Sequence, residues 1–448
     1  MKSYSTKLTR RSFLAKTASA AAFTIVPSSV LGLRGAISPN EKLNLAAIGV
    51  GGQGGGDLNN LASENIVALC DVDSQRAAAS FKKFPNAKQF QDFRRMFDAM
   101  EKQIDAVLVA TPDHMHSVAA MHAIKRGKHV FCEKPLAHSI YEVRELMRAA
   151  REHKVITQLG NQGHSFDSIR VFREWIEDGA IGHVREVHAM CGSVYSQIDL
   201  LDAVKTGQPV PETLNWDLWL GPVAKRPYHS AYLPAKWRAW SAFGTGVIGD
   251  WTCHIVDPVF WTLDLGAPTR IEAETGDYDP EKQGETFPRA STVHYEFAAR
   301  GQRPPVKLVW HDGASQPARP EELEKDETLP SIGALVIGEK GKIIYGSHGA
   351  GRPRILNDSV MDAVSKKPTR FAKSPGHYKE WIDSCKSGKP AGSPFAYGGP
   401  LTEIALLGAI AIRCKGEKLQ WNGAKMKFTN SDRANRFLRP TFREGWTL

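Results

Sequence analysis

Two segments of this sequence hold side chains that can move a proton on or off a hydroxyl group. Asp250 and His254 are four residues apart, so a helix here would place both on one face. Imidazole can take a proton near neutral pH, and a carboxylate can orient it. Lys134 ends an apolar run before a proline that restricts its backbone, so its ammonium group can hydrogen-bond a substrate hydroxyl. The spacing leaves other roles open: Asp250 as a helix N-cap, His254 as a packing residue and Lys134 as a solvated lysine.

A glycine-rich turn near the start of the chain predicts a nucleotide site. An apolar run leads into Gly49, Gly51 and Gly54, which permit a tight turn, close approach to a pyrophosphate and close packing of the next helix. A second apolar run ends at Asp71, about twenty residues beyond the turn, where a carboxylate accepts the hydroxyls of an adenosine ribose. Such an acid disfavours a 2′-phosphate, so the pattern predicts NAD rather than NADP.

Two further blocks follow apolar runs, at the strand ends where a parallel sheet binds its ligands. Residues 111–116 read Thr-Pro-Asp-His-Met-His and can face a nicotinamide, and residues 133–135 read Glu-Lys-Pro. His114 and His116 lack an accompanying cluster of acids or cysteines, so we expect no metal site. The residues expected to contact the cofactor are Gly49, Val50, Gly51, Gly52, Gln53, Gly54, Asp71, Thr111, Pro112, Asp113, His116, Glu133 and Lys134.

Aromatic residues crowd one region of the second half. Six of the eleven tryptophans lie between Trp216 and Trp261, with polar side chains among them. Aromatic faces beside hydrogen-bonding groups suit a sugar ring, although core packing is the commoner role of any single tryptophan. The candidate substrate contacts in this region are Tyr228, Trp237 and Arg238.

The elements that must hold the glycine turn and Lys134 alternate between strand and helix. Such alternation indicates βαβ units, and we expect a doubly wound parallel sheet of the Rossmann type over residues 42–164. Ser139 and Glu142 form a capping box that opens a helix running to His153. The expected strands are 43–50, 65–71, 104–110, 129–132 and 155–159.

After a helix expected over 165–178, strand-like runs follow one another with turns between them. They predict an α/β domain over residues 165–448 with a large, mainly antiparallel open sheet. Residues 339–341 resemble a hairpin tip, 313–331 a surface loop, and the apolar helix 401–412 is expected to pack against this domain. The expected strands are 184–191, 270–275, 291–298, 306–311, 333–338 and 342–346.

Residues 1–36 have the composition of a targeting segment. Arg10-Arg11 forms a twin-arginine pattern, and the weakly apolar stretch after it is too short and mild to span a bilayer stably. We expect export to the periplasm or an equivalent compartment, with an ordinary amphipathic tail as the alternative. Twin-arginine export moves folded proteins, which suits an enzyme that must acquire a dinucleotide first.

Composition narrows the class of protein further. The chain has 448 residues, of which 42% are hydrophobic, enough for two cores. Its formal net charge of +10 falls to +4 without the six basic residues of the leader, and no basic run of five or more appears elsewhere, so we expect no nucleic-acid partner. The six cysteines are far apart and include no CxxC pair, so no disulfide framework is implied.

The glycine turn with its distal acid, the 111–116 block, Glu-Lys-Pro at 133–135 and Asp250-x-x-x-His254 resemble, in this order, the Gfo/Idh/MocA oxidoreductases. That family is named for glucose–fructose oxidoreductase, inositol dehydrogenase and a rhizopine catabolism protein. The resemblance covers roughly residues 43–415 and implies a Rossmann domain followed by an open-sheet domain, assembled through that sheet into dimers or tetramers. The block Trp-Asp-x-Trp-Leu-Gly-Pro at 216–222 resembles exported members.

This resemblance implies an NAD-dependent oxidoreductase that acts on a secondary hydroxyl of a sugar, glycoside or cyclitol. Lys134, Asp250 and His254 match the catalytic positions: His254 would take the hydroxyl proton, Lys134 would polarise the oxygen, and Asp250 would position substrate and histidine. Gln162 and His164 match, more loosely, a loop near nicotinamide and substrate. That match adds Gln162 to the cofactor contacts and His164 to the substrate contacts.

Two other functions stay open on the sequence. A glycosidase that uses bound NAD in a closed cycle would oxidise the sugar, eliminate the aglycone and reduce the product again, and it needs a second base. A non-catalytic sugar-binding protein would be easier to accept had Lys134 or His254 been replaced. Free NAD is scarce outside the cytoplasm, so we expect a cofactor that stays bound and is recycled in place. The candidates for the second base are Tyr195, Tyr228, His229 and His164.

Overall fold

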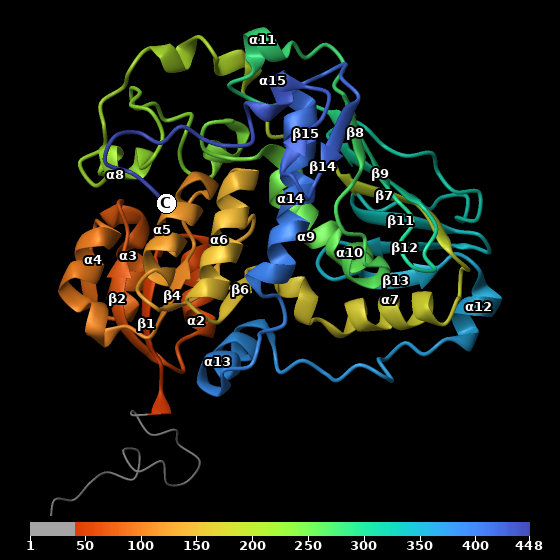
Figure 1. Cartoon of the computed structure of the whole chain (residues 1–448), viewed down its shortest axis with the longest axis horizontal. Helices are drawn as coiled ribbons and strands as arrows, with labels where there is room; N and C mark the ends of the chain where they lie inside the picture. Colours follow the sequence, from red (N-terminus) through yellow and green to blue (C-terminus); the bar gives the residue numbers. More distant parts are fainter. Residues whose placement is uncertain (1–40) are drawn as a thin grey trace, which may run out of the picture. The chain divides into compact units, whose positions relative to one another are not determined.

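The computed structural model describes residues 41–448, and Asn44–Leu448 form one compact unit. The expected twin-arginine leader lies outside the described residues. Two sheets organise the compact unit: a six-stranded sheet built from its N-terminal part and a nine-stranded sheet built from the remainder (Figure 1). The chain leaves the first sheet through the short helix η4 (Gln162–Ser165), next to the boundary expected between residues 164 and 165.

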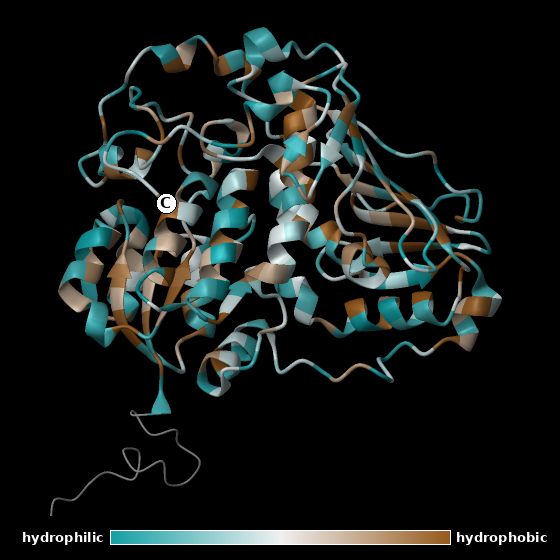
Figure 2. Ribbon diagram, in the orientation of Figure 1, coloured by the Kyte–Doolittle hydropathy of each residue, from teal (hydrophilic) through white to brown (hydrophobic). Residues whose placement is uncertain are grey.

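The first sheet is parallel throughout, in the order β3-β2-β1-β4-β5-β6. This confirms the predicted doubly wound sheet. Its central strands are continuous apolar runs because helices cover both faces (Figure 2). The strands are β1 Asn44–Ile48, β2 Asn65–Cys70, β3 Lys88–Phe90, β4 Ala106–Val109, β5 His129–Cys132 and β6 Thr157–Leu159, and the helices are α2 Gln53–Asn60, α3 Ser74–Lys83, α4 Phe93–Met100, α5 Asp113–Ile124 and α6 Ile140–Glu152.

Local signals in this half were informative except at the sheet edge. The capping box is confirmed, since Ser139 accepts a hydrogen bond from the backbone N–H of Glu142 at the start of α6. Strand β3 was missed because it is a three-residue edge strand whose first two side chains, Lys88 and Gln89, are exposed and polar. An apolar run therefore never marks it.

The second sheet has the order β13-β12-β11-β7-β10-β9-β8-β14-β15. Neighbouring strands are antiparallel except β7 and β10, which run parallel, so the predicted mainly antiparallel sheet is confirmed. Helices α9, α10 and α14 pack with this part of the chain (Figure 1). The strands are β7 Val184–Cys191, β8 Arg270–Glu274, β9 Ser291–Phe297, β10 Val306–Asp312, β11 Ile332–Gly338, β12 Lys342–Gly346, β13 Gly351–Ile355, β14 Leu419–Asn422 and β15 Lys427–Phe428.

Three strands of this sheet were missed. Strand β13 reads Gly-Arg-Pro-Arg-Ile and lacks apolar alternation, while β14 and β15 are only four and two residues long. Their pairing comes from tertiary contact rather than from a local pattern. The helices of this half are α7 Asp167–Glu177, α8 Trp216–Leu220, α9 Gly246–Ile255, α10 Asp257–Leu263, α11 Pro280–Gln283, α12 Asp358–Ala363, α13 His377–Ser387, α14 Phe395–Arg413 and α15 Asp432–Asn435.

Helix α14 packs against the second domain as expected, and it also contacts the first half of the chain. It begins at Phe395 and contacts both α6 and α9. A Cβ at Gly399 would lie 2.4 Å from Met147 of α6, and one at Gly408 would lie 2.0 Å from the Tyr295 hydroxyl. Glycine thus permits close packing on both sides. Among the described helices, α14 alone is long and apolar enough to cross a membrane. However, 83% of its most apolar 18-residue stretch is buried within the structure.

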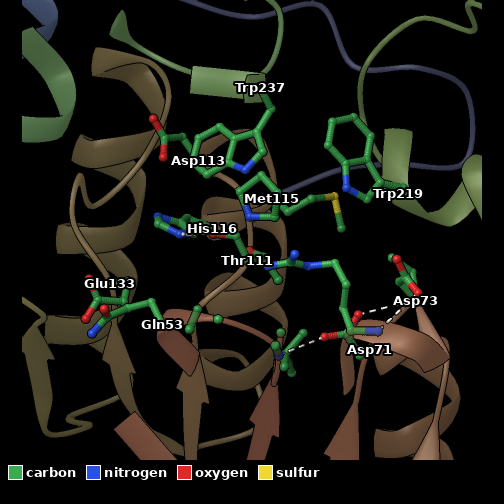
Figure 3. A pocket seen from close by; sticks show the side chains of 18 of the residues that line it. Gln53, Asp71, Asp73, Thr111, Asp113, Met115, His116, Glu133, Trp219 and Trp237 are labelled. Carbon is green, nitrogen blue, oxygen red and sulfur yellow. Dashed lines mark hydrogen bonds between the residues drawn. The ribbon is translucent and has the colours of Figure 1, made fainter. Parts of the chain in front are cut away.

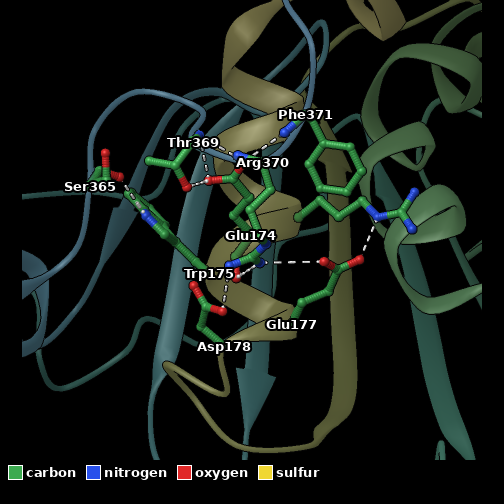
Figure 4. A network of polar contacts seen from close by, with 9 residues as sticks. Glu174, Trp175, Glu177, Asp178, Ser365, Thr369, Arg370 and Phe371 are labelled. Carbon is green, nitrogen blue, oxygen red and sulfur yellow. Dashed lines mark hydrogen bonds and ion pairs between the residues drawn. The ribbon is translucent and has the colours of Figure 1, made fainter.

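A carboxylate fastens the segment between α12 and α13 onto α7. Glu174 accepts hydrogen bonds from the backbone N–H groups of Thr369, Arg370 and Phe371 at 2.9, 2.7 and 3.2 Å (Figure 4). The Thr369 hydroxyl donates a fourth, at 2.8 Å. Burial opposes the charge, but these donors outweigh it and lower the pKa of Glu174 to about 2.

Candidate active site

A cavity of about 400 Å³ lies at the carboxyl ends of β1, β2, β4 and β5. Asp71 and Asp73 stand at one end of the view in Figure 3, and Glu133 and Gln53 stand on the other side. The second half of the chain closes the cavity with Trp219 and Trp237. This is the position where parallel α/β sheets bind their ligands.

The glycine turn is held by contacts that only glycine allows. Gly49 has a φ of +81°, and a Cβ there would lie 2.6 Å from the carbonyl oxygen of Ala110. A Cβ at Gly54 would lie 1.9 Å from the carbonyl oxygen of Gly49, so α2 packs directly on the end of β1. Gly52 is the N-cap residue of α2, and it has no side chain that could cap the helix. The first N–H groups of α2 are thereby free to bind an anion such as a pyrophosphate.

Asp71 holds this turn as well as facing the cavity. Its Oδ2 accepts hydrogen bonds from the N–H groups of Val50 at 2.9 Å and Gly51 at 3.2 Å, and its Oδ1 accepts one from Asp73 at 3.0 Å. An ionised carboxylate has further lone pairs for ribose hydroxyls. Arg76, which sequence reasoning missed, lines the same end with its guanidinium against the backbone of Gly52.

The C-terminal segment covers the end of the cavity near Asp71. Trp446 lines it beside Phe93, with ring centroids 6.1 Å apart, and the guanidinium of Arg94 lies 4.4 Å from the Trp446 ring. An ion pair between Arg443 and Asp217 fixes this segment near α8 (Figure 1). The aromatic wall was missed because Trp446 stands alone in an irregular stretch.

The 111–116 block places one hydroxyl in the wall of the cavity and two histidines against backbone carbonyl groups. The Thr111 hydroxyl is buried, faces the cavity and has no hydrogen-bond partner among the residues that the structure describes. The ring nitrogens of His116 lie 2.7 Å from the Pro135 carbonyl and 2.8 Å from that of Thr111, and those of His114 face two further carbonyls. Burial lowers the pKa of His116 to about 4. Across residues 41–448, no three His, Cys, Asp or Glu side chains are grouped to hold a metal ion.

Two carboxyl groups of the cavity have raised pKa values. Burial raises the pKa of Asp113 to about 7, and the Thr245 hydroxyl donates to its Oδ2 at 2.9 Å. Burial and the charge of Asp57 raise the pKa of Glu133 to about 8. The raised pKa values favour the protonated form of each group, and that form can donate a hydrogen bond to a ligand.

Lys134 and Asp250 form a buried ion pair between the two halves of the chain. The ammonium nitrogen of Lys134, at the end of β5, lies 2.6 Å from Oδ1 of Asp250 and 3.2 Å from its backbone carbonyl oxygen. Burial opposes the charge of Lys134, but the carboxylates of Asp250 and Glu133 raise its pKa. Of three ammonium donors, two serve Asp250 and one remains for the cavity.

Asp250 positions cations rather than the histidine. Arg238 Nε lies 3.1 Å from its Oδ1, and the Tyr195 hydroxyl donates to its Oδ2 at 2.8 Å. Burial would raise the pKa of Asp250, but the charges of Lys134 and Arg238 outweigh it and hold the pKa well below the usual range. The helix begins four residues earlier, at Gly246, so Asp250 is not an N-cap. We expected Asp250 to orient His254; its oxygens instead bind Lys134, Arg238 and Tyr195.

His254 lies one helical turn further and faces the cavity. It is 4% exposed, and its Nδ1 is buried without a partner in the described part of the chain. Burial and the nearby charge of Lys134 lower the pKa of His254 well below its ordinary value. A neutral imidazole at pH 7 is a proton acceptor, and the free ring nitrogen is suited to that role.

The structure brings most of the expected site residues to this cavity. Val50 and Gly54 lie behind the turn instead, and Asp250 lies behind Lys134. His164 and Tyr228 do not line it: His164 lies 3.1 Å from the Asp257 carboxylate, and Tyr228 packs edge-on against Trp216. The expected residues that line it are Gly49, Gly51, Gly52, Gln53, Asp71, Thr111, Pro112, Asp113, His116, Glu133, Lys134, Gln162, Trp237, Arg238 and His254.

His348 is the most important lining residue that sequence reasoning missed. It stands in the turn between β12 and β13, within Gly-Ser-His-Gly-Ala-Gly. A histidine between glycines after a strand is a weak signal, and only the fold brings it to α9. The arrangement as a whole fits a dinucleotide: an uncapped helix start at one end, the unpaired Thr111 hydroxyl along its path, and a proton acceptor with a cation at the other end.

Comparisons with known proteins agree with this geometry. Residues 43–161 match the family model of the Gfo/Idh/MocA oxidoreductases described as an NAD-binding Rossmann fold, and residues 172–299 match that of their C-terminal α/β domain. These two models together cover more than half of the chain.

Sequence relatives share part of the chain. The 1,5-anhydro-D-fructose reductase of Ensifer adhaerens is 26% identical over 44% of this chain and 49% of its own length. The inositol 2-dehydrogenase of Salmonella typhimurium is 28% identical over 38% and 51%. The chain thus spans about half the length of these relatives. In fold, the WlbA dehydrogenase of Bordetella pertussis, solved with NADH and UDP-GlcNAcA, superposes with a TM-score of 0.57 at 16% identity, over 85% of this chain and 99% of that one.

Proposed function

The chain belongs to the Gfo/Idh/MocA oxidoreductase family, and we propose that it oxidises or forms a secondary hydroxyl of a sugar, glycoside or cyclitol with bound NAD. One observation supports this most: Lys134, fixed by Asp250, shares a cavity with the glycine turn and with His254, whose Nδ1 has no partner among residues 41–448. A dinucleotide lying along that cavity would end beside both residues.

The dinucleotide would be held by the glycine turn, Asp71 and Thr111, and when bound it supplies a hydride acceptor. Lys134 directs its remaining ammonium donor at the substrate oxygen, which stabilises negative charge there as the proton leaves. His254 accepts that proton. Because the ion pair and the imidazole are buried, water competes poorly for these contacts, and the electrostatic interactions are stronger than in solution.

The substrate end of the cavity suits a polyhydroxylated ring. Trp237 and Trp251 line it, and the guanidinium of Arg238 lies 4.3 Å from the Trp237 ring centre. Aromatic faces pack on the apolar face of a sugar, and Arg238 and Lys134 can donate to its hydroxyls. The names of the relatives, an anhydrofructose reductase and an inositol dehydrogenase, support this substrate class.

Export and assembly are further parts of the proposal. The twin-arginine pattern at Arg10-Arg11 supports export of the folded protein, with its cofactor bound and recycled in place. We also propose a homo-oligomer that assembles through the nine-stranded sheet. Strands β8 and β9 of this sheet leave alternate side chains partly exposed, in support of such a contact face.

Mass spectrometry of the purified protein tests the proposal. We expect NAD or NADH to be released on denaturation at about one per chain. The retained cofactor should then change its nicotinamide absorbance when a panel of sugars, glycosides and cyclitols is added. A protein that binds neither NAD nor NADP, or whose bound dinucleotide responds to no polyol in the panel, would contradict the proposed activity.

A further inference from the structure

A second imidazole stands beside His254. The rings of His254 and His348 are stacked, with centroids 4.1 Å apart and planes 29° apart. Trp251 packs edge-on against both, at 5.9 and 5.8 Å. Both histidines line the cavity. Two stacked rings can reach neighbouring atoms of one small substrate.

The backbone holds His348 in an unusual conformation. Its φ is +59°, and Gly349, Ala350 and Arg352 also have positive φ values, of +68°, +56° and +49°. Residues other than glycine rarely adopt this region, and such strain gathers at functional sites. The turn is fixed from outside: a Cβ at Gly163 would lie 2.5 Å from the Gly349 nitrogen, and the Ser168 hydroxyl donates to the Gly349 carbonyl at 2.7 Å.

Among the described residues neither imidazole is hydrogen-bonded to a carboxylate; the charge of Asp250 raises the pKa of both, but burial and the charge of Lys134 outweigh it. Nδ1 of His348 lies 2.9 Å from the Ser347 hydroxyl, and Lys134 is the nearby cation. Burial and the Lys134 charge lower the pKa of His348, as they do for His254. The site therefore presents two neutral bases side by side, although removal of one hydroxyl proton needs only one.

We propose that His348 is a second base of this site, which removes a proton from the carbon beside the carbonyl group that hydroxyl oxidation creates. This inference rests on the proposed function, because that reaction produces the carbonyl. The C–H bond breaks, its proton passes to a ring nitrogen of His348, and its electron pair moves onto the carbonyl oxygen as an enolate beside Lys134. Return of a proton to the carbon restores the ketone. The glycosidase alternative requires this same abstraction, and the four candidates weighed from the sequence for that base do not line the cavity.

Deuterium exchange tests the assignment. The protein with its retained dinucleotide is placed in D2O with a supplied ketone, 2-keto-myo-inositol or methyl 3-keto-glucopyranoside, and loss of the proton next to the carbonyl is followed by NMR. Oxidation of the matching polyols is measured in parallel. His348→Asn is the main variant, because asparagine tolerates positive φ. His153→Asn, at the exposed end of α6, is the matched control.

We expect exchange in the wild type and in His153→Asn, and a ratio of exchange to oxidation that falls at least about 100-fold in His348→Asn. Without turnover, the imidazole resonance that His348→Asn removes should shift when the ketone is added to the wild type. An unchanged ratio in His348→Asn would overturn the inference and assign His348 a packing role. Oxidation without any exchange in the wild type would also overturn it while leaving the proposed function in place, whereas absence of both reactions would contradict both.

Discussion

The ammonium group of Lys134 and the carboxylate of Asp250 lie 2.6 Å apart, with Lys134 at the end of β5 and Asp250 on α9. The two residues come from different halves of the chain, so their pairing depends on how those halves pack. Helix α14 contacts both α6 and α9, so it helps to fix how the two halves pack together. The geometry of the reacting end is therefore a tertiary property rather than one of either sheet.

Replacement of either group that faces the substrate oxygen should lower turnover strongly while leaving dinucleotide binding nearly unchanged. We expect Lys134→Met and His254→Asn each to lower turnover by about 10²–10⁴, because each removes a positioned acid or base. Dinucleotide affinity, measured by calorimetry, should stay near that of the wild type. Near-normal turnover in either variant would remove its assigned role, and loss of folding would indicate a structural one.

The acidic end of the cavity should select NAD. Asp71 would lie against a 2′-phosphate, so we expect NAD to bind more tightly than NADP. Asp71→Ala should lower the preference for NAD over NADP by about 10- to 100-fold, since each tenfold change in affinity corresponds to about 1.4 kcal/mol. Because Asp71 also holds the N–H groups of Val50 and Gly51, both affinities should fall, and the ratio of the two dissociation constants is the measurement. Tighter NADP binding by the wild type would refute this interpretation.

The Glu174 contacts predict acid-sensitive stability. The folded pKa of about 2 is below the ordinary value of 4.5, so the stabilisation is present above pH 4.5 and is lost as pH falls toward 2. Glu174→Gln should cost about 2 kcal/mol at neutral pH, since hydrogen bonds to a charge are lost. As the pH falls from 4.5 toward 2, the melting temperatures of Glu174→Gln and the wild type should become equal. Glu321→Gln, at an exposed position outside this network, is the control, and parallel pH curves for Glu174→Gln and wild type would contradict the assignment.

The leader should direct the folded protein out of the cytoplasm. Replacement of Arg10 and Arg11 by lysine should retain the protein inside, as cell fractionation and immunoblotting can measure. Wild-type protein from the periplasm should hold its dinucleotide. Exported protein that consistently lacks dinucleotide, or that needs stoichiometric added NAD, would instead indicate a freely diffusing cofactor.

The sequence predicted those parts of the fold and site that depend on local pattern. The parallel sheet follows from apolar runs that alternate with helices, and the glycine turn from spacings that backbone packing enforces at Gly49 and Gly54. Lys134 and His254 stood out because each lies in a short motif, the first just after β5 and the second on α9.

The remainder depends on contacts between distant segments. His348 reaches His254 only because the turn between β12 and β13 lies beside α9, and Trp446 reaches the cavity only because the last residues fold back to α8. His164 shows the opposite error: its motif position suggested the substrate, but the fold turns it toward Asp257 and Tyr397. The direction of a side chain in a helix as short as η4 depends on the segments packed around it rather than on its own sequence.

Transfer of deuterium from substrate to cofactor tests the central claim most directly. A polyol that the protein oxidises is supplied with deuterium on the reacting carbon. The dinucleotide is then recovered, and its deuterium content is measured by mass spectrometry. The account predicts one deuterium on the nicotinamide ring in the wild type and in His153→Asn, and almost none in His254→Asn. Oxidised product with all of its deuterium lost to solvent and none on the dinucleotide would contradict the account.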